Sequence, residues 1–98
     1  MEAGAGRDHP DETVTVRYWA GAKAAAGTSE DVFDVRGALT LDEVLRRVLA
    51  LHPGDRMART VAVCSVLVGD QPVRSQDPGS VTVPPGAVVE LLPPFAGG

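Results

Sequence analysis

The chain is poor in the residues from which most metal and redox sites are built. It contains one cysteine, Cys64, and two histidines, His9 and His52, in 98 residues. A single cysteine excludes an internal disulfide, a four-cysteine zinc site and an iron–sulfur cluster held by this chain alone. We therefore expect no metal ion and no bound cofactor, and a reducing cytoplasm as the compartment.

Positive charge is also scarce. Nine Lys and Arg residues are outnumbered by thirteen Asp and Glu residues, which gives a net charge of −4 and a pI of about 4.9. Proteins that bind nucleic acids or anionic membranes cluster Lys and Arg residues to contact phosphates. The composition therefore argues against both and favours a partner with a basic surface.

Long apolar runs are absent. No stretch is long enough to span a membrane, and the first ten residues lack the apolar core of a signal peptide. The usual catalytic patterns are missing as well, because there is no nucleophile elbow, no Walker loop and no cluster of metal ligands. The sequence thus predicts neither a membrane protein nor an enzyme with side-chain chemistry of its own.

The composition that remains is that of one folded domain. Hydrophobic residues make up 44% and charged residues 22% of the chain, a balance typical of globular proteins. Residues 1–12 are small and polar, so we predict a disordered leader there. Residues 13–94 are expected to form the domain, and residues 95–98 an exposed tail.

Alternation and helical periodicity predict the first elements of the domain. Val14, Val16 and Tyr18 alternate with other residues and indicate a half-buried strand. A short helical turn over 21–26 and a second strand over 30–35 follow.

A capping box predicts the main helix. Thr40 and Glu43 stand three residues apart at its start, and apolar residues then recur at helical spacing until His52. We expect His52 to stabilise the end of this helix through its charge rather than to act in catalysis.

Strands are predicted for most of the second half of the chain. We expect Cys64 to lie within one of them as a buried, inert thiol. The segments are, in order, a polar connector over 55–59, a strand over 61–68, a short strand over 72–74 after a turn at Gly69-Asp70, and a strand over 87–92 with Glu90 as its one charge.

Two strands, a crossing helix and further strands indicate an α+β fold. If the first and last strands pair in parallel, the right-handed crossover rule places the helix on one face of a mixed sheet. This arrangement is a ubiquitin-like β-grasp with one main helix packed on one face.

The tail is the most informative part of the chain. Pro93 and Pro94 end the last strand, because neither can donate to a sheet ladder, and Phe95, Ala96, Gly97 and Gly98 follow. One aromatic residue and three small residues form a tail that can thread a narrow tunnel in a partner enzyme. The alternative interpretation is a frayed chain end without function.

The ending Leu-Leu-Pro-Pro-Phe-Ala-Gly-Gly over 91–98 resembles the tail of the MoaD family, the small sulfur-carrier subunits of molybdopterin synthase within the ubiquitin-like MoaD/ThiS superfamily. The resemblance extends from about Val14 to Gly98. It implies a sulfur carrier for molybdopterin, that is, molybdenum cofactor, biosynthesis.

The resemblance also implies a reacting group and a set of partners. In the family, the C-terminal carboxylate, here that of Gly98, attacks the α-phosphate of ATP on a ubiquitin-activating-type adenylyltransferase. A sulfur donor enzyme then supplies the sulfur of a thiocarboxylate, which is used inside the large molybdopterin synthase subunit of a heterotetramer. Pro93, Pro94, Phe95, Ala96 and Gly97 correspond to the tail that enters the partner.

Two alternatives remain at this point. A sulfur carrier for thiazole or cysteine synthesis would share the fold and the chemistry of Gly97 and Gly98 but use other partners. A plain ubiquitin-like interaction domain would have no thiocarboxylate cycle.

Strand alternation also predicts a docking surface. If Val14, Val16 and Tyr18 face the helix, Trp19 faces outward. With Ala62, Cys64, Val66 and Val68 taken as the inward set of the third strand and Val89 and Leu91 as that of the last strand, Leu67 and Leu92 join Trp19 on the open face. The alternative is that these are scattered surface hydrophobes.

Overall fold

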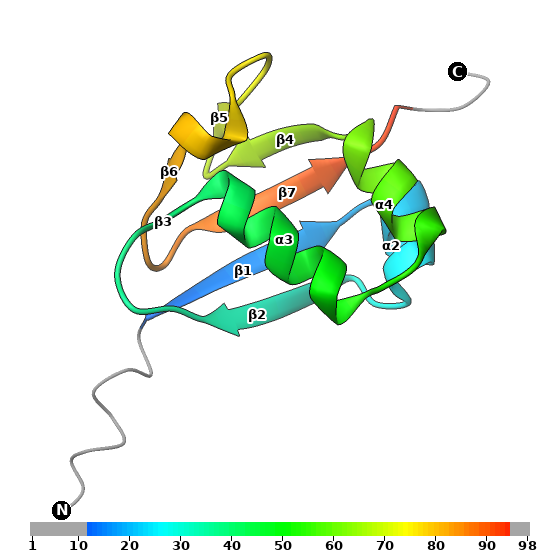
Figure 1. Cartoon of the computed structure of the whole chain (residues 1–98), viewed down its shortest axis with the longest axis horizontal. Helices are drawn as coiled ribbons and strands as arrows, with labels where there is room; N and C mark the ends of the chain where they lie inside the picture. The colour runs from blue at the N-terminus through cyan, green and yellow to red at the C-terminus, as the bar shows by residue number, and fades with distance from the viewer. Residues whose placement is uncertain (1–11, 95–98) are drawn as a thin grey trace, which may run out of the picture.

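The computed structural model describes residues 12–94 of the chain. Its helices and strands are labelled in Figure 1. In chain order they are β1 (Thr13–Tyr18), α2 (Ala20–Ala26), β2 (Glu30–Asp34), β3 (Leu39–Thr40), α3 (Leu41–Leu51), α4 (Asp55–Ala62), β4 (Ser65–Val68), β5 (Gln71–Pro72), the 3-10 turn η1 (Pro78–Ser80), β6 (Thr82–Val83) and β7 (Val88–Leu92).

A mixed five-stranded sheet forms the framework, in the order β2-β1-β7-β4-β5. β1 and β7 run parallel, whereas the other neighbouring pairs are antiparallel. Figure 1 shows α3 lying across one face of this sheet. The strand order, the parallel central pair and the crossing helix are those of the β-grasp fold, as predicted.

The first strand and the short helix after it follow the predicted pattern. Val14, Val16 and Tyr18 are at most 2% exposed, which confirms that they form the inward face of β1. α2 ends at Gly27, whose φ of 78° places it in the left-handed region that favours glycine.

The described residues begin one residue before the predicted domain. The carbonyl of Glu12 accepts a hydrogen bond from Val35 N–H (2.9 Å), and its Oε1 accepts one from Gly37 N–H (3.2 Å). Glu12 therefore belongs to the packed domain, while the rest of the predicted leader lies outside the described residues.

The cap of α3 is half of the predicted capping box. Thr40 Oγ1 accepts a hydrogen bond from Glu43 N–H at 3.1 Å. The Glu43 carboxylate instead accepts from Arg46 (3.0 Å) and Arg47 (3.2 Å), one turn further along the helix. Thr40 thus caps an N–H that would otherwise have no partner, and the Glu43 side chain forms ion pairs on the helix surface.

The prediction for residues 55–64 was wrong. The expected connector and the start of the expected strand form one helix, α4, and the strand begins only at Ser65. Met57 and Val61, spaced four apart, are 2% and 9% exposed and lie on the face with which α4 packs into the core. Burial of this face overrides the β-propensity of the valines.

The hairpin after β4 is confirmed with shifted bounds. Val68 pairs with Gln71 across the two-residue turn Gly69-Asp70, so β5 is formed by Gln71 and Pro72 rather than by residues 72–74. Gly69 adopts a positive φ of 63°, as the first position of a tight hairpin turn requires.

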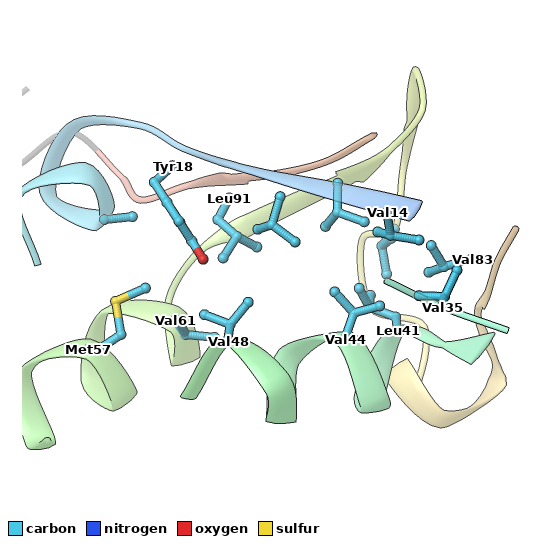
Figure 2. Close-up of a cluster of buried hydrophobic side chains, with 14 residues drawn as sticks. Val14, Tyr18, Val35, Leu41, Val44, Val48, Met57, Val61, Val83 and Leu91 are labelled. Atoms are coloured by element: carbon cyan, nitrogen blue, oxygen red, sulfur yellow. The ribbon is translucent and has the colours of Figure 1, made fainter. Parts of the chain in front are cut away.

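The core lies between α3 and the sheet. Figure 2 shows Val44, Val48 and Val61 pointing from the helices toward Val14, Tyr18 and Leu91 of the strands. These side chains are almost fully buried, at 9% exposure or less. The residues that alternate with them along the strands face the opposite way, so within residues 12–94 the outer face of the sheet is left open.

Candidate functional site

The tail leaves the fold from the central strand of the sheet. β7 lies between β1 and β4, and its last residue, Leu92, sits opposite Ser65 of β4. Pro93 and Pro94 follow, and the strand ends before them because proline has no N–H to donate. The predicted site residues Phe95, Ala96, Gly97 and Gly98 lie outside the described residues, and their roles stay predictions.

The predicted register of the outer face is confirmed for the observed strands, whereas Ala62, predicted to face inward from the third strand, is exposed at the end of α4. Val89 and Leu91 are fully buried, so Leu92 faces outward, and Leu67 does the same on β4. Trp19 follows β1, and its N–H donates to the carbonyl of Leu91 (3.2 Å). Trp19 is 46% exposed, and Leu67 and Leu92 are half-buried. We refer to Trp19, Leu67 and Leu92 as the outer patch.

One neighbour of the outer patch was not predicted from the sequence. Pro72 on β5 pairs with Leu67 and therefore lies on the same face. It is exposed, and a proline suits this edge strand because it offers no N–H to another chain. The Gly69-Asp70 turn was the signal that would have placed it.

Glu90 lies within the outer patch. It is opposite Leu67 on β4 and beside Arg17 on β1, and Trp19 Nε1–H donates to its Oε1 at 2.9 Å. This bond holds the indole across β7 and orders the outer patch. The sequence showed Glu90 as the one charge of its strand but gave no role for it.

Two open clefts flank the outer patch. One, of about 230 Å³, is lined by residues that include Arg17, Trp19 and Lys23. The other, of about 250 Å³, is lined by residues that include Leu67 and Arg74. The outer face is thus uneven, with depressions on both sides of the outer patch.

Cys64 is a structural thiol. It was predicted to lie buried within a strand, but it is half-buried and lies between α4 and β4. Its Sγ–H donates to the carbonyl of Thr60 at 3.2 Å. Burial raises the pKa of the Cys64 thiol to about 11. Because the thiolate is the reactive form of cysteine, this residue is poorly suited to nucleophilic chemistry at neutral pH.

His52 is the C-cap residue of α3, as predicted, and its ring contacts a residue of β2. Its backbone N–H caps the carbonyl of Val48, and its Nε2 lies 2.6 Å from Asp31 Oδ2. Tyr18 O–H donates to the same carboxylate oxygen at 2.9 Å, and the Tyr18 and His52 rings meet edge to face. The cluster ties the end of α3 to β1 and β2, on the side of the sheet away from the outer patch.

Two further findings concern metals and membranes. Among residues 12–94, no group of three or more His, Cys, Asp or Glu side chains is placed to hold a metal ion. In the same part of the chain, no helix has the length and apolar character needed to cross a membrane.

Comparison with known proteins agrees with this geometry. The molybdopterin synthase sulfur carrier subunit of Chlamydomonas reinhardtii is 28% identical over 86 residues, which cover 87% of this chain and 98% of that protein. The crystal structure of SAMP1 from Haloferax volcanii superimposes with a TM-score of 0.72 at 21% identity, covering 88% of this chain and 99% of that one, and shows the shared fold.

A complex of subunits 1 and 2 of the molybdopterin-converting factor from Helicobacter pylori contains a second similar chain. It is 28% identical, with a TM-score of 0.55 and coverage of 88% of this chain and 99% of that one. The ThiS family matches residues 16–98, a range that includes β7, the outer patch and the two terminal glycines. The chain belongs to the ThiS family.

Proposed function

We propose that this chain is the sulfur-carrying small subunit of a molybdopterin synthase and is not an enzyme on its own. The observation that carries the proposal is the extent of the family match, which includes Gly97 and Gly98 beyond the central strand. The relatives from Chlamydomonas reinhardtii and Helicobacter pylori, both 28% identical, support the molybdopterin branch of the family.

The reacting group of the proposed carrier is the carboxylate of Gly98. An α-carboxylate is anionic at neutral pH and is a poor acyl donor until it gains a better leaving group. A ubiquitin-activating-type adenylyltransferase supplies ATP, the carboxylate oxygen attacks the α-phosphate, and pyrophosphate leaves. A sulfur donor enzyme then delivers sulfur at the oxidation level of sulfide, which attacks the acyl carbon. The bond from this carbon to AMP breaks, AMP leaves, and a thiocarboxylate results.

The fold supports this role by separating the docking surface from the reacting group. The outer patch adjoins the end of β7, so a partner that covers Trp19 and Leu92 also receives the chain beyond Pro94. An exposed tryptophan flanked by two leucines has the composition of an interface centre. We assign this surface to the large molybdopterin synthase subunit, with Ala96 and Gly97 narrow enough to enter its active site.

Intact mass measurement of the protein from its native host tests the carrier chemistry. A thiocarboxylate form is heavier by the mass difference between sulfur and oxygen, and iodoacetamide treatment of a Cys64→Ala variant should label only that form. A plain ubiquitin-like interaction domain would give the carboxylate mass alone.

Affinity capture tests the pathway. With a tag placed before Thr13, the large molybdopterin synthase subunit should be recovered from the host. Recovery of a thiazole synthase in its place would assign the carrier to thiazole synthesis and contradict the molybdopterin role.

A further inference from the structure

A carboxylate lies among the apolar residues of the outer patch. Glu90 lies between Leu67 on one neighbouring strand and Arg17 on the other. Only one of its oxygens, Oε1, has a donor among the described residues, the indole N–H of Trp19 at 2.9 Å. The indole is a neutral donor, so the negative charge of Glu90 is oriented by Trp19 but is not compensated by it.

Docking of a partner on the outer patch makes the uncompensated charge of Glu90 energetically unfavourable. A partner that covers Trp19, Leu67 and Leu92 necessarily excludes water from Glu90, which is already half-buried. Removing water from an unpaired carboxylate is strongly unfavourable. A partner surface that is purely apolar is therefore a poor fit for this face, and a cation placed opposite Glu90 removes the penalty.

The chain itself does not supply that cation in the described structure. Arg17 is the neighbour of Glu90 across β1 and β7, but its Nε pairs with Glu30 Oε1 at 3.4 Å on the opposite side. Within residues 12–94, Glu90 forms no ion pair. Asp34 lies on the same face through its pairing with Thr13, so Glu90 is not the only carboxylate there.

We propose that the outer patch recognises a partner surface that presents an arginine to Glu90. This inference rests on the proposed function, and it names the chemistry that the large subunit must bring. Arginine fits better than lysine for two reasons. Its planar guanidinium can bond a carboxylate with two parallel N–H groups, and it stacks favourably on an aromatic face such as that of Trp19.

Titration calorimetry with the purified large molybdopterin synthase subunit of the host tests the proposal. Glu90→Gln retains an oxygen that can accept from Trp19 but loses the charge, and we expect it to raise Kd by at least about tenfold. Asp34→Asn removes one charge from the same face, away from the patch, and should change Kd by less than about twofold. Thermal unfolding of each variant checks that the fold is retained.

A charge exchange identifies the partner residue. Glu90→Arg should abolish binding, and replacing one interface arginine of the large subunit with glutamate should restore it to within about tenfold of wild type. Equal affinities of the wild type and Glu90→Gln would overturn the inference while leaving the proposed function intact. If the wild-type chain fails to bind the large subunit, both are overturned.

Arg17 provides the competing explanation, because it could swing from Glu30 to Glu90 on docking. In that case Arg17→Gln alone would weaken binding as much as Glu90→Gln, and the Glu90→Gln effect would vanish in the Arg17→Gln background. We expect instead that the effect of Glu90→Gln persists at full size in that background. Its disappearance would show that the counter-ion belongs to this chain and would contradict the proposed arginine of the partner.

Discussion

Tyr18 and Trp19 are neighbours in the chain but lie on opposite faces of the sheet. Tyr18 is 2% exposed and Trp19 is 46% exposed, as the alternation of a strand requires. Their polar atoms follow the same division, since Tyr18 donates to Asp31 on the helix side and Trp19 donates to Glu90 on the outer side. Tyr18 therefore packs in the core, and Trp19 remains accessible on the surface.

Trp19→Ala should separate binding from stability. We expect the variant to lose at least about 1 to 2 kcal/mol of binding free energy for the large subunit, because buried aromatic anchors dominate interfaces. The free energy of unfolding should change by less than about 1 kcal/mol, as at other exposed positions. Calorimetric titration and urea unfolding measure the two quantities.

Val32→Ala is the matched control for Trp19→Ala. Val32 is 57% exposed and lies on the same face, on the edge strand β2, away from β7. Its replacement should leave affinity nearly unchanged. A comparable loss with both variants would show that the outer patch is not the centre of the interface.

Tyr18 should make the protein sensitive to high pH. Burial, the hydrogen bond to Asp31 and the charge of that carboxylate raise the pKa of Tyr18. The resulting stability is fully present below the unfolded tyrosine pKa of about 10 and is lost as pH rises above it, because the unfolded chain releases a proton that the native state retains. Above pH 10, Tyr18 contributes about −1.4 kcal/mol per pH unit to the slope of the free energy of unfolding against pH.

Urea unfolding between pH 9 and 11.5, in wild type and Tyr18→Phe, measures this slope. Cys64 titrates in both proteins, so the difference between the two curves isolates Tyr18. Tyr18→Phe should be less stable at neutral pH through loss of the hydrogen bond, but its stability should fall less steeply above pH 10. Parallel curves would contradict the assigned shift.

The ring contact of His52 could not be predicted from the local sequence. The sequence places His52 at the end of a helix, which correctly predicts the helix boundary. Its ring partner, Asp31, is 21 residues away in the chain, and only the packing of α3 against β2 brings the two together. No local pattern contains that information.

Among the helices and strands, hydrophobic periodicity predicted correctly those that have one apolar face and are several residues long. β1, α3 and β7 were predicted with boundaries close to those observed. β3 and β6 were missed, since two-residue strands carry no period. α4 was predicted as a connector and the start of a strand, because its valines favour strands. The four-residue spacing of Met57 and Val61 is the pattern that indicates a helix.

Met57→Ala tests the packing of α4. Met57 is 2% exposed, and truncating a buried methionine removes contacts and leaves a cavity, at a cost of about 2 to 4 kcal/mol. Arg56→Ala, at the exposed neighbouring position on the same helix, should stay within about 0.5 kcal/mol of wild type. Chemical unfolding of both variants gives the comparison, and similar values for the two would mean that α4 is not a core element.

At the scale of the whole molecule, the topology follows from a few rules. With parallel pairing of the first and last strands taken as a condition, the right-handed crossover rule placed the helix on one face of the sheet. The structure shows this pair at the centre of the sheet. The consequence is that the last strand is paired on both sides, so the chain continues past Pro94 from an interior strand of the sheet.

The same division between fold and tail predicts the effect of deleting Gly98. All buried hydrophobic side chains of the described residues lie between Val14 and Leu91, so removing a residue beyond Pro94 subtracts nothing from this core. We expect unfolding free energy within about 0.5 kcal/mol of wild type and near-normal affinity for the large subunit through the outer patch. Molybdopterin formation in a reconstituted assay with ATP, the adenylyltransferase and a sulfur donor should be abolished, because the carboxylate is withdrawn by one residue from the point at which it is adenylated.

Supplying the variant at higher concentration separates the two roles, since more docked carrier cannot restore a misplaced acyl group. Substantial product from the deletion variant would show that the reacting group is not the Gly98 carboxylate.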